Sequence, residues 1–120
     1  MAREADDERY AYLGAPSDST GWQYGQAGSV GADLRIDCWL DVRDATIQRA
    51  RFEVFAGEQA RCAALALAQW LEGRDLEQAR AVNGLDIAAM ADMADEARSQ
   101  ALCIEDALQA AMNATRTDRR

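Results

Sequence analysis

The stretch IQRARFEVFAGEQARCAALALAQWLE, residues 47–72, is the one around which the chain is organised. Residues 47–55 are rich in β-branched and aromatic side chains, which favours a strand covered by other elements. Ala56 and Gly57 break that strand, and from Glu58 the apolar residues recur with the period of an α-helix. These apolar residues are Ala60, Ala63, Ala64, Leu67, Ala68, Trp70 and Leu71. Because a helix that is apolar on nearly every side is usually covered on more than one side, we expect a strand followed directly by a buried helix.

The composition predicts a single globular domain over residues 1–120. Apolar residues make up 49% of the chain and charged residues 28%, as in ordinary soluble proteins. With 13 basic and 21 acidic residues the formal charge is -8, and such a surface repels phosphate backbones and anionic lipid. No apolar run approaches the roughly 20 residues of a membrane span, and the N-terminus lacks the apolar region of a signal peptide. We therefore expect a cytoplasmic protein that binds neither nucleic acid nor membranes.

Two further strands are predicted before the central stretch, at Trp22–Ser29 and Asp33–Val42. In the second, apolar and charged residues alternate, as expected for a strand with one face toward the core. Its inward face holds Leu34, Ile36, Cys38, Leu40 and Val42. A turn at residues 43–45 then leads into the strand of the central stretch, so we expect an antiparallel meander of three strands.

Trp39 is the one aromatic residue on the charged face of the second predicted strand. We therefore expect either that the N-terminal segment covers it, or that it is exposed and forms a protein-contact hot spot.

The remaining elements are helices. Gly73 suits the C-terminal end of the central helix, Asp75 suits the start of a short helix with a capping box, and Asp86 suits the start of another that runs to about Met90. The last helix is predicted from about residues 94–96 to Asn113. Together these elements predict an α+β fold, in which a three-stranded antiparallel sheet is packed on one face by helices.

The two ends of the chain are predicted to lie outside this body. Residues 1–21 form an N-terminal segment and loop, with a short helix over Ala2–Leu13, and residues 114–120 form a frayed tail.

The residue inventory excludes most catalytic chemistry. The chain has no histidine, which removes the commonest general base and the commonest metal ligand. Its three cysteines, Cys38, Cys62 and Cys103, are far apart and show no metal-binding spacing. We expect them to pack as small hydrophobic residues, with a site built from these three thiols as the alternative. No enzyme motif is present, so we expect a protein that is not an enzyme.

A set of residues along the chain resembles the IscU/NifU-type iron–sulfur cluster scaffold domain. It comprises Tyr12, Pro16, Gly21, Gly28-Ser29-Val30-Gly31-Ala32, Ala50-Arg51-Phe52, Trp70-Leu71-Glu72-Gly73-Arg74, Leu76, Ala79, Asn83, Asp86-Ile87-Ala88, Glu105-Asp106-Ala107-Leu108 and Ala110-Ala111. Their order and nearly constant spacing carry the resemblance. It implies an IscU/SufE-like fold and a role among the proteins of cluster assembly.

The same resemblance implies ligand positions that this chain leaves vacant. The family holds its cluster or zinc with three cysteines, an aspartate and often a histidine. The first cysteine would follow Val30-Gly31-Ala32, where this chain is about four residues shorter. The second falls on Gly57, and the histidine and third cysteine fall on Ser99 and Gln100. Neither glycine nor an amide can bind a soft metal or carry a persulfide as a thiolate does.

Two functions follow as hypotheses. The first is a divergent scaffold-like protein without cofactor that serves as a protein-interaction or regulatory module, with a cysteine desulfurase or another cluster-assembly component as partner. The alternative is an unconventional carrier of an iron–sulfur cluster or zinc that uses Cys38, Cys62 or Cys103.

Overall fold

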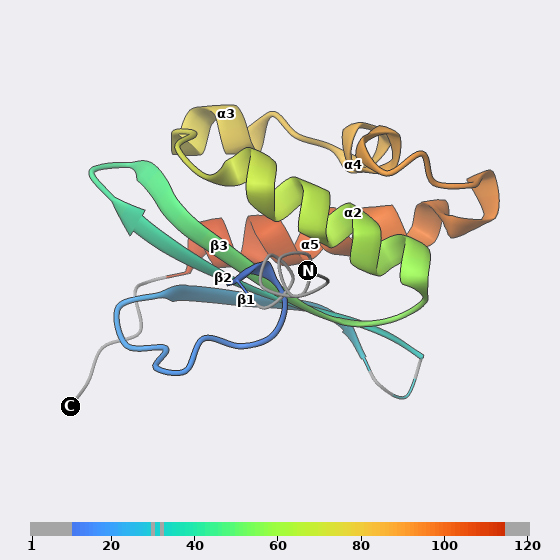
Figure 1. Cartoon of the computed structure of the whole chain (residues 1–120), viewed down its shortest axis with the longest axis horizontal. Helices are drawn as coiled ribbons and strands as arrows, with labels where there is room; N and C mark the ends of the chain where they lie inside the picture. The colour runs from blue at the N-terminus through green and yellow to red at the C-terminus, as the bar shows by residue number, and fades with distance from the viewer. Residues whose placement is uncertain (1–10, 30, 32, 115–120) are drawn as a thin grey trace, which may run out of the picture.

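The computed structural model describes residues 11–29, 31 and 33–114, and shows a layer of helices on one face of a sheet (Figure 1). The elements are β1 (Gln23–Ser29), β2 (Leu34–Arg43), β3 (Thr46–Phe55), α2 (Glu58–Leu71), α3 (Leu76–Arg80), α4 (Gly84–Met90), the 3-10 helix η2 (Asp95–Ala97) and α5 (Arg98–Asn113). The three strands form an antiparallel sheet in the order β1-β2-β3. The predicted α+β fold is confirmed. Most of the helix predicted over Ala2–Leu13 and nearly all of the predicted tail lie outside the described residues.

The central stretch forms the strand, break and helix that its sequence predicts. β3 ends at Phe55 and α2 begins at Glu58, with Gly57 as the N-cap residue. α2 packs on β3 and also contacts α4 and α5, which explains why its apolar residues spread over more than one side. Six of them are buried: Ala60, Ala63, Ala64, Leu67, Ala68 and Leu71.

The short helices begin at capping boxes, one of which was predicted wrongly. Asp75 caps α3, and its carboxylate accepts the backbone N–H of Gln78 (2.7 Å), as expected. α4, however, begins after Asn83 rather than Asp86. Asp86 is the third residue of that helix, and its side chain accepts the backbone N–H of Asn83 (3.1 Å). An asparagine and an aspartate at this spacing both suit a helix start, and only the backbone geometry decides between them.

α5 lies on β1 at very close range because Gly25 has no side chain. A Cβ atom at this position would be 2.1 Å from the backbone nitrogen of Ala111. The side chain of Gln23 strengthens the contact, since its amide donates to the carbonyl oxygens of Ala111 (3.0 Å) and Met112 (3.3 Å). This contact sets the position of α5 along the sheet.

Both faces of β2 are covered, which changes the expectation for Trp39. Trp39 is only 9% exposed, and its ring centroid lies 5.3 Å from that of Tyr24 on β1. Asp37 and Asp41 on the same face are also buried, and they form ion pairs with Arg35 (3.2 Å) and Arg49 (2.9 Å). The alternative of an exposed tryptophan is therefore wrong, and Tyr24 packs against the ring. Cover by the N-terminal segment stays a prediction.

Within the described ranges, every helix is too short or too polar to cross a lipid bilayer.

Candidate functional site

Gly57, Ser99 and Gln100, the positions where the family resemblance implies ligands, lie toward one end of the sheet. Gly57 lies two residues beyond Phe55, which pairs with Arg35 next to the β1–β2 turn. Gly28 of β1 is opposite Arg35, so it lies at the same end of the sheet. α5 reaches this end as well, because the Cys103 sulfur would be 3.1 Å from a Cβ atom on Gly28. Ser99 and Gln100 precede Cys103 by one helical turn, so they lie still closer to that end.

A direct hydrogen bond also joins the two helix starts. The side chain of Gln59, at the start of α2, accepts the backbone N–H of Ala94, just before η2 (2.8 Å). The start of β2, the start of α2 and the start of α5 therefore lie together at one corner of the molecule, the ligand corner.

The residues in this corner leave room but offer no suitable ligand atoms. Gly57 is exposed, and an added Cβ would meet no atom within 4 Å. Ser99 is exposed and Gln100 half-buried. The side-chain oxygen of Gln100 is buried and accepts no hydrogen bond in the described part of the chain. A hydroxyl and a neutral amide are poor ligands for zinc and iron–sulfur clusters, which prefer thiolate and imidazole. These residues therefore do not fit the family's cluster or zinc.

The three cysteines are not brought together to replace them. Cys38 is fully buried under the helices, Cys103 is buried between α5 and β1, and Cys62 is exposed on α2, where its thiol lies 3.7 Å from a Glu58 carboxylate oxygen. Burial raises the pKa of the Cys38 thiol well above its ordinary value. Burial, with Asp106 nearby, also raises the pKa of Cys103. Over residues 11–29, 31 and 33–114, no three histidine, cysteine or acidic side chains are grouped so as to hold a metal ion.

A shallow cavity of about 340 Å³ lies beside the corner, along the outer edge of β3. Leu13, Gly14, Arg61 and residues 52–55 line it. Phe55, the last residue of β3 before the strand–helix break, is 48% exposed in this cavity.

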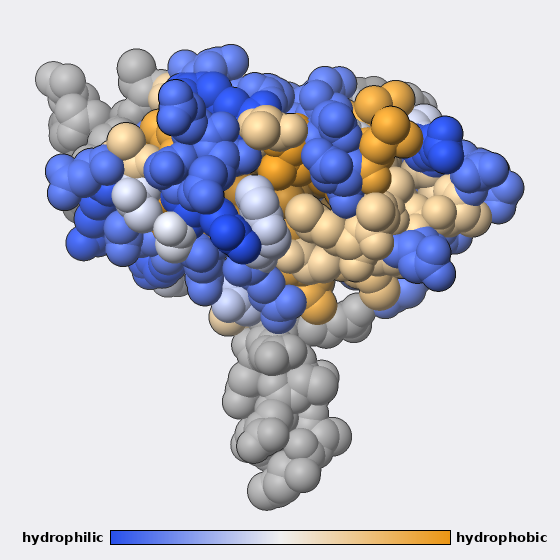
Figure 2. Space-filling model, turned by 90° about the horizontal axis from the view of Figure 1, so that it is seen from above, coloured by the Kyte–Doolittle hydropathy of each residue, from blue (hydrophilic) through white to orange (hydrophobic). Residues whose placement is uncertain are grey.

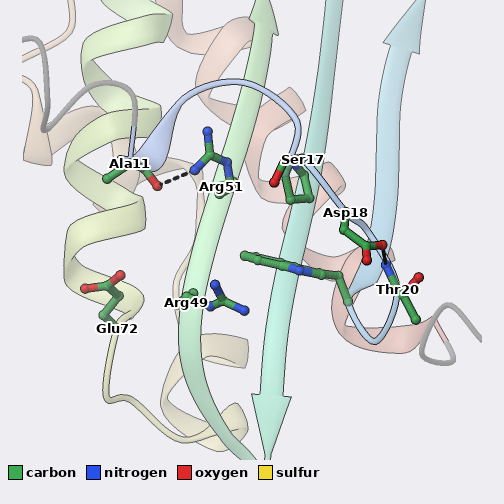
Figure 3. A pocket seen from close by; sticks show the side chains of 9 residues that line it. Ala11, Ser17, Asp18, Thr20, Arg49, Arg51 and Glu72 are labelled. Carbon is green, nitrogen blue, oxygen red and sulfur yellow. Dashed lines mark hydrogen bonds between the residues drawn. The ribbon is translucent and has the colours of Figure 1, made fainter.

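A second cavity, of about 550 Å³, lies on the face of the sheet opposite the helices (Figure 3). Arg49 and Arg51 of β3 point into it, with Glu72 on one side and the loop of Ser17 and Asp18 on the other. The Arg49 guanidinium lies 4.5 Å from the Trp22 ring centre.

Arg51 holds the N-terminal segment rather than a ligand. Its guanidinium donates to the carbonyl oxygens of Ala11 (2.9 Å), Leu13 (2.9 Å) and Gly14 (2.8 Å). These three carbonyl oxygens engage most of the N–H donors of the guanidinium. Sequence reasoning noticed Arg51 only as part of the family resemblance and missed this role, because the three acceptors are backbone atoms.

The helical side of the molecule carries exposed apolar surface. Polar side chains dominate one half of this view, while apolar side chains gather in the other (Figure 2). Leu85 on α4 is 63% exposed and Leu102 on α5 is 55% exposed. Their helices pack closely here, since a Cβ on Gly84 would lie 2.8 Å from a methyl group of Leu102. The sequence gives little sign of this patch, because single leucines on amphipathic helices usually face the core.

Comparison with known proteins assigns the chain to a family. Comparison with curated proteins gave no match. The family model described as "NifU-like N terminal domain" matches residues 13–119, nearly the whole chain and all the elements described above. This match agrees with the resemblance in sequence and with the α+β fold. The chain therefore belongs to the NifU-like N-terminal domain family of iron–sulfur cluster assembly scaffolds.

Proposed function

We propose that this chain is a scaffold-like family member that has given up metal binding at the ligand corner and acts as a protein-interaction or regulatory module in cluster assembly. The observation that carries the proposal is the corner itself. By the family resemblance, Gly57, Ser99 and Gln100 stand where ligands are expected, and none of them provides a thiolate or an imidazole. Function resides in sites rather than in folds, so a retained fold with a changed site favours a changed role.

The exposed leucines support the interaction part of the proposal. Leu85 and Leu102 are more than half exposed on two helices that touch. Exposed apolar side chains that gather in one region commonly mark a surface that another protein covers. The proposed partner is a cysteine desulfurase or another cluster-assembly component, in the cytoplasm, and no catalytic role is assigned to the chain.

The alternative carrier function has no structural support comparable to this. Two of its three candidate thiols are buried with raised pKa values, and a protonated thiol binds soft metals poorly. Cys62 stands apart from them on the exposed side of α2.

Metal analysis tests the first half of the proposal. The protein is purified without oxygen, and its iron, zinc and acid-labile sulfide are measured beside those of a variant with Gly57→Cys, Ser99→His and Gln100→Cys. We expect far less than one metal per chain in the wild type, and a clear gain in zinc in the variant because its three side chains share one corner. Stoichiometric metal in the wild type that is lost in Cys62→Ala would show that the carrier function is right.

Affinity capture from the host lysate tests the second half. Wild-type protein is compared with Leu85→Lys/Leu102→Lys, which puts charge on the exposed patch, and with Gln48→Lys, which puts a charge on an exposed position of β3. We expect a cluster-assembly protein to be retained by the wild type and by Gln48→Lys and lost with the double variant. Equal capture of the same protein by all three would contradict a role for the patch.

A further inference from the structure

β1 is an edge strand, and within residues 11–29, 31 and 33–114 nothing pairs with the backbone groups on its outer side. The carbonyl of Phe52 on β3 accepts an N–H from outside the sheet (2.7 Å), so Phe52 turns its backbone groups outward. Cys38 of β2 is the residue opposite Phe52, so the two do not bond to each other and the backbone N–H and C=O of Cys38 point toward β1. There they meet Gly25, which is opposite Cys38 on β1. Because alternate residues of a strand bond in opposite directions, Tyr24 and Gln26 direct their N–H and C=O groups away from the sheet.

These four groups have no hydrogen-bond partner in the described part of the chain. Gln26 is exposed and Tyr24 half-buried, so a docking chain can reach them. The strand also lacks the usual protection against pairing, since QYGQAGS contains neither proline nor a charged side chain.

The opposite edge of the sheet differs, because the chain covers it twice. At one point Gly14 donates its N–H to Phe52. At another, Ile47 exchanges hydrogen bonds with Gly73 and Arg74 (both 2.8 Å). The described part of the chain therefore covers much of the β3 edge and none of the β1 edge.

α5 determines what can add to that edge. It lies almost in contact with the backbone of Gly25, as the 2.1 Å approach of Ala111 to a Cβ there shows. A second copy that paired through its own β1 would bring its own α5 within about one strand spacing of this helix, whereas packed helices need roughly 8–10 Å. A single extended peptide carries no such helix, so it fits where a second copy does not.

Charged residues near the outer edge of β1 indicate which charge a bound segment should carry. Cys103 lies against Gly28 and Ala110 lies against Gly25, so these two residues mark the flank of α5 that lies over β1. Asp106, exposed and midway between them, is on the same flank by helical spacing. The Asp106 carboxylate, on a chain whose net charge is -8, favours a cationic segment.

We infer that the outer edge of β1 binds an extended, lysine- or arginine-containing segment of a partner protein, which adds as a fourth strand beside Tyr24 and Gln26. The inference rests on the proposed interaction role and names the chemistry of the segment that the partner supplies. Main-chain hydrogen bonds provide the attachment, and Asp106 selects the charge.

A synthetic probe tests this without the natural partner. The probe is an acetylated and amidated seven-residue peptide that alternates valine and lysine, and its control replaces each lysine with glutamate. We expect the lysine peptide to bind in fluorescence anisotropy and the glutamate peptide not to bind. On binding, hydrogen exchange should slow at the amides of Tyr24 and Gln26 and stay unchanged at Gly25, whose amide already lies inside the sheet.

Two variants of one residue separate strand addition from a contact of the side chain. Gln26→Pro removes the outward N–H at a position where an edge strand tolerates proline, and we expect about tenfold weaker binding. Gln26→Ala keeps the backbone, and we expect wild-type binding. Asp106→Asn should weaken the lysine peptide about two- to fivefold. Circular dichroism checks that each variant is folded.

The remaining outcomes are decisive. Equal binding of both peptides, or equal binding by Gln26→Pro and Gln26→Ala, overturns the inference. So does a concentration-dependent dimer in analytical ultracentrifugation that Gln26→Pro dissociates, because the edge would then pair with a second copy. Binding of the lysine peptide only after removal of residues 115–120 would also overturn the inference, because the occupant of the edge would then be the chain's own tail and not a partner. None of these results would change whether a cluster-assembly protein is captured from the lysate. The strand-addition inference and the proposed function can therefore be refuted independently.

Discussion

Replacing Gly25 with alanine should loosen the whole helical layer, because this residue sets the distance between β1 and α5. The new Cβ would lie 2.1 Å from the nitrogen of Ala111, 2.6 Å from the carbonyl carbon of Ala110 and 2.7 Å from the oxygen of Ala107. All three are backbone atoms, so no side chain can rotate away. To reach ordinary contact, the helix must move by about 1.3 Å from its present position.

Such a shift is costly for the side chains on the buried face of α5. Ile104, Leu108 and Ala111 are fully buried, and a gap of about 0.5–1 Å already removes a quarter to a half of a dispersion contact. Overpacking against side chains typically costs about 1–3 kcal/mol, and the rigid backbone here points to about 3 kcal/mol or more. We expect the urea midpoint to fall by about 1.5 M at an unchanged slope.

Gly57→Ala is the matched control. It adds the same methyl group where nothing lies within 4 Å, at φ -78° and ψ 177°, which any residue adopts. We expect its free energy of unfolding to stay within about 0.5 kcal/mol of wild type. Tryptophan fluorescence during urea unfolding measures both variants. Equal stability of the two would refute the reasoning, because it would mean that α5 does not depend on this contact.

Three further outcomes follow from individual side chains. Burial and the hydrogen bond to Asp37 (2.5 Å) raise the pKa of Tyr24 above its ordinary 10.0, so the unfolded chain loses this proton first. Tyr24 therefore contributes its full stabilisation below about pH 10, and this contribution is lost as pH rises through the folded-state pKa. Urea midpoints measured from pH 8 to 11 should decline less in Tyr24→Phe than in the wild type. An equal decline in both would contradict this role of Tyr24. Iodoacetamide should modify Cys62 within minutes and Cys38 only on unfolding, as mass spectrometry can follow, and earlier labelling of Cys38 would contradict its burial. Arg51→Ala should cost about 1–3 kcal/mol and speed proteolysis of the segment it holds, with Arg51→Lys restoring little; wild-type proteolysis in both would disprove this role.

Sequence patterns were sufficient for the elements and the order of the fold. The change of period at Gly57 predicts the strand-to-helix break, and the structure places it between Phe55 and Glu58. Alternation along β2 predicts its inward face, and the family resemblance is confirmed by the match over residues 13–119. These features depend on neighbours in the chain, so local spacing records them.

The charged face of β2 was harder to interpret from sequence. Asp37 and Asp41 suggest a solvent-exposed face, and they made Trp39 look exposed. In the fold, arginines from the same and neighbouring strands pair with both carboxylates, and Tyr24 covers the indole ring. Burial of Asp41 depends on Arg49 of β3, and burial of Trp39 depends on Tyr24 of β1, and the pattern of β2 alone contains neither neighbour.

For the candidate site, the sequence by itself determined that Gly57, Ser99 and Gln100, where the family resemblance implies ligands, carry no thiolate or imidazole. Only the tertiary structure decided that these positions lie toward one end of the sheet and that Cys38, Cys62 and Cys103 are not grouped as metal ligands. It also decided that no described residue pairs with the outer edge of β1. The physical reason is the same in each case. Residue chemistry is a property of each position, whereas proximity, burial and unpaired backbone groups arise when β1, β3 and α5 pack together.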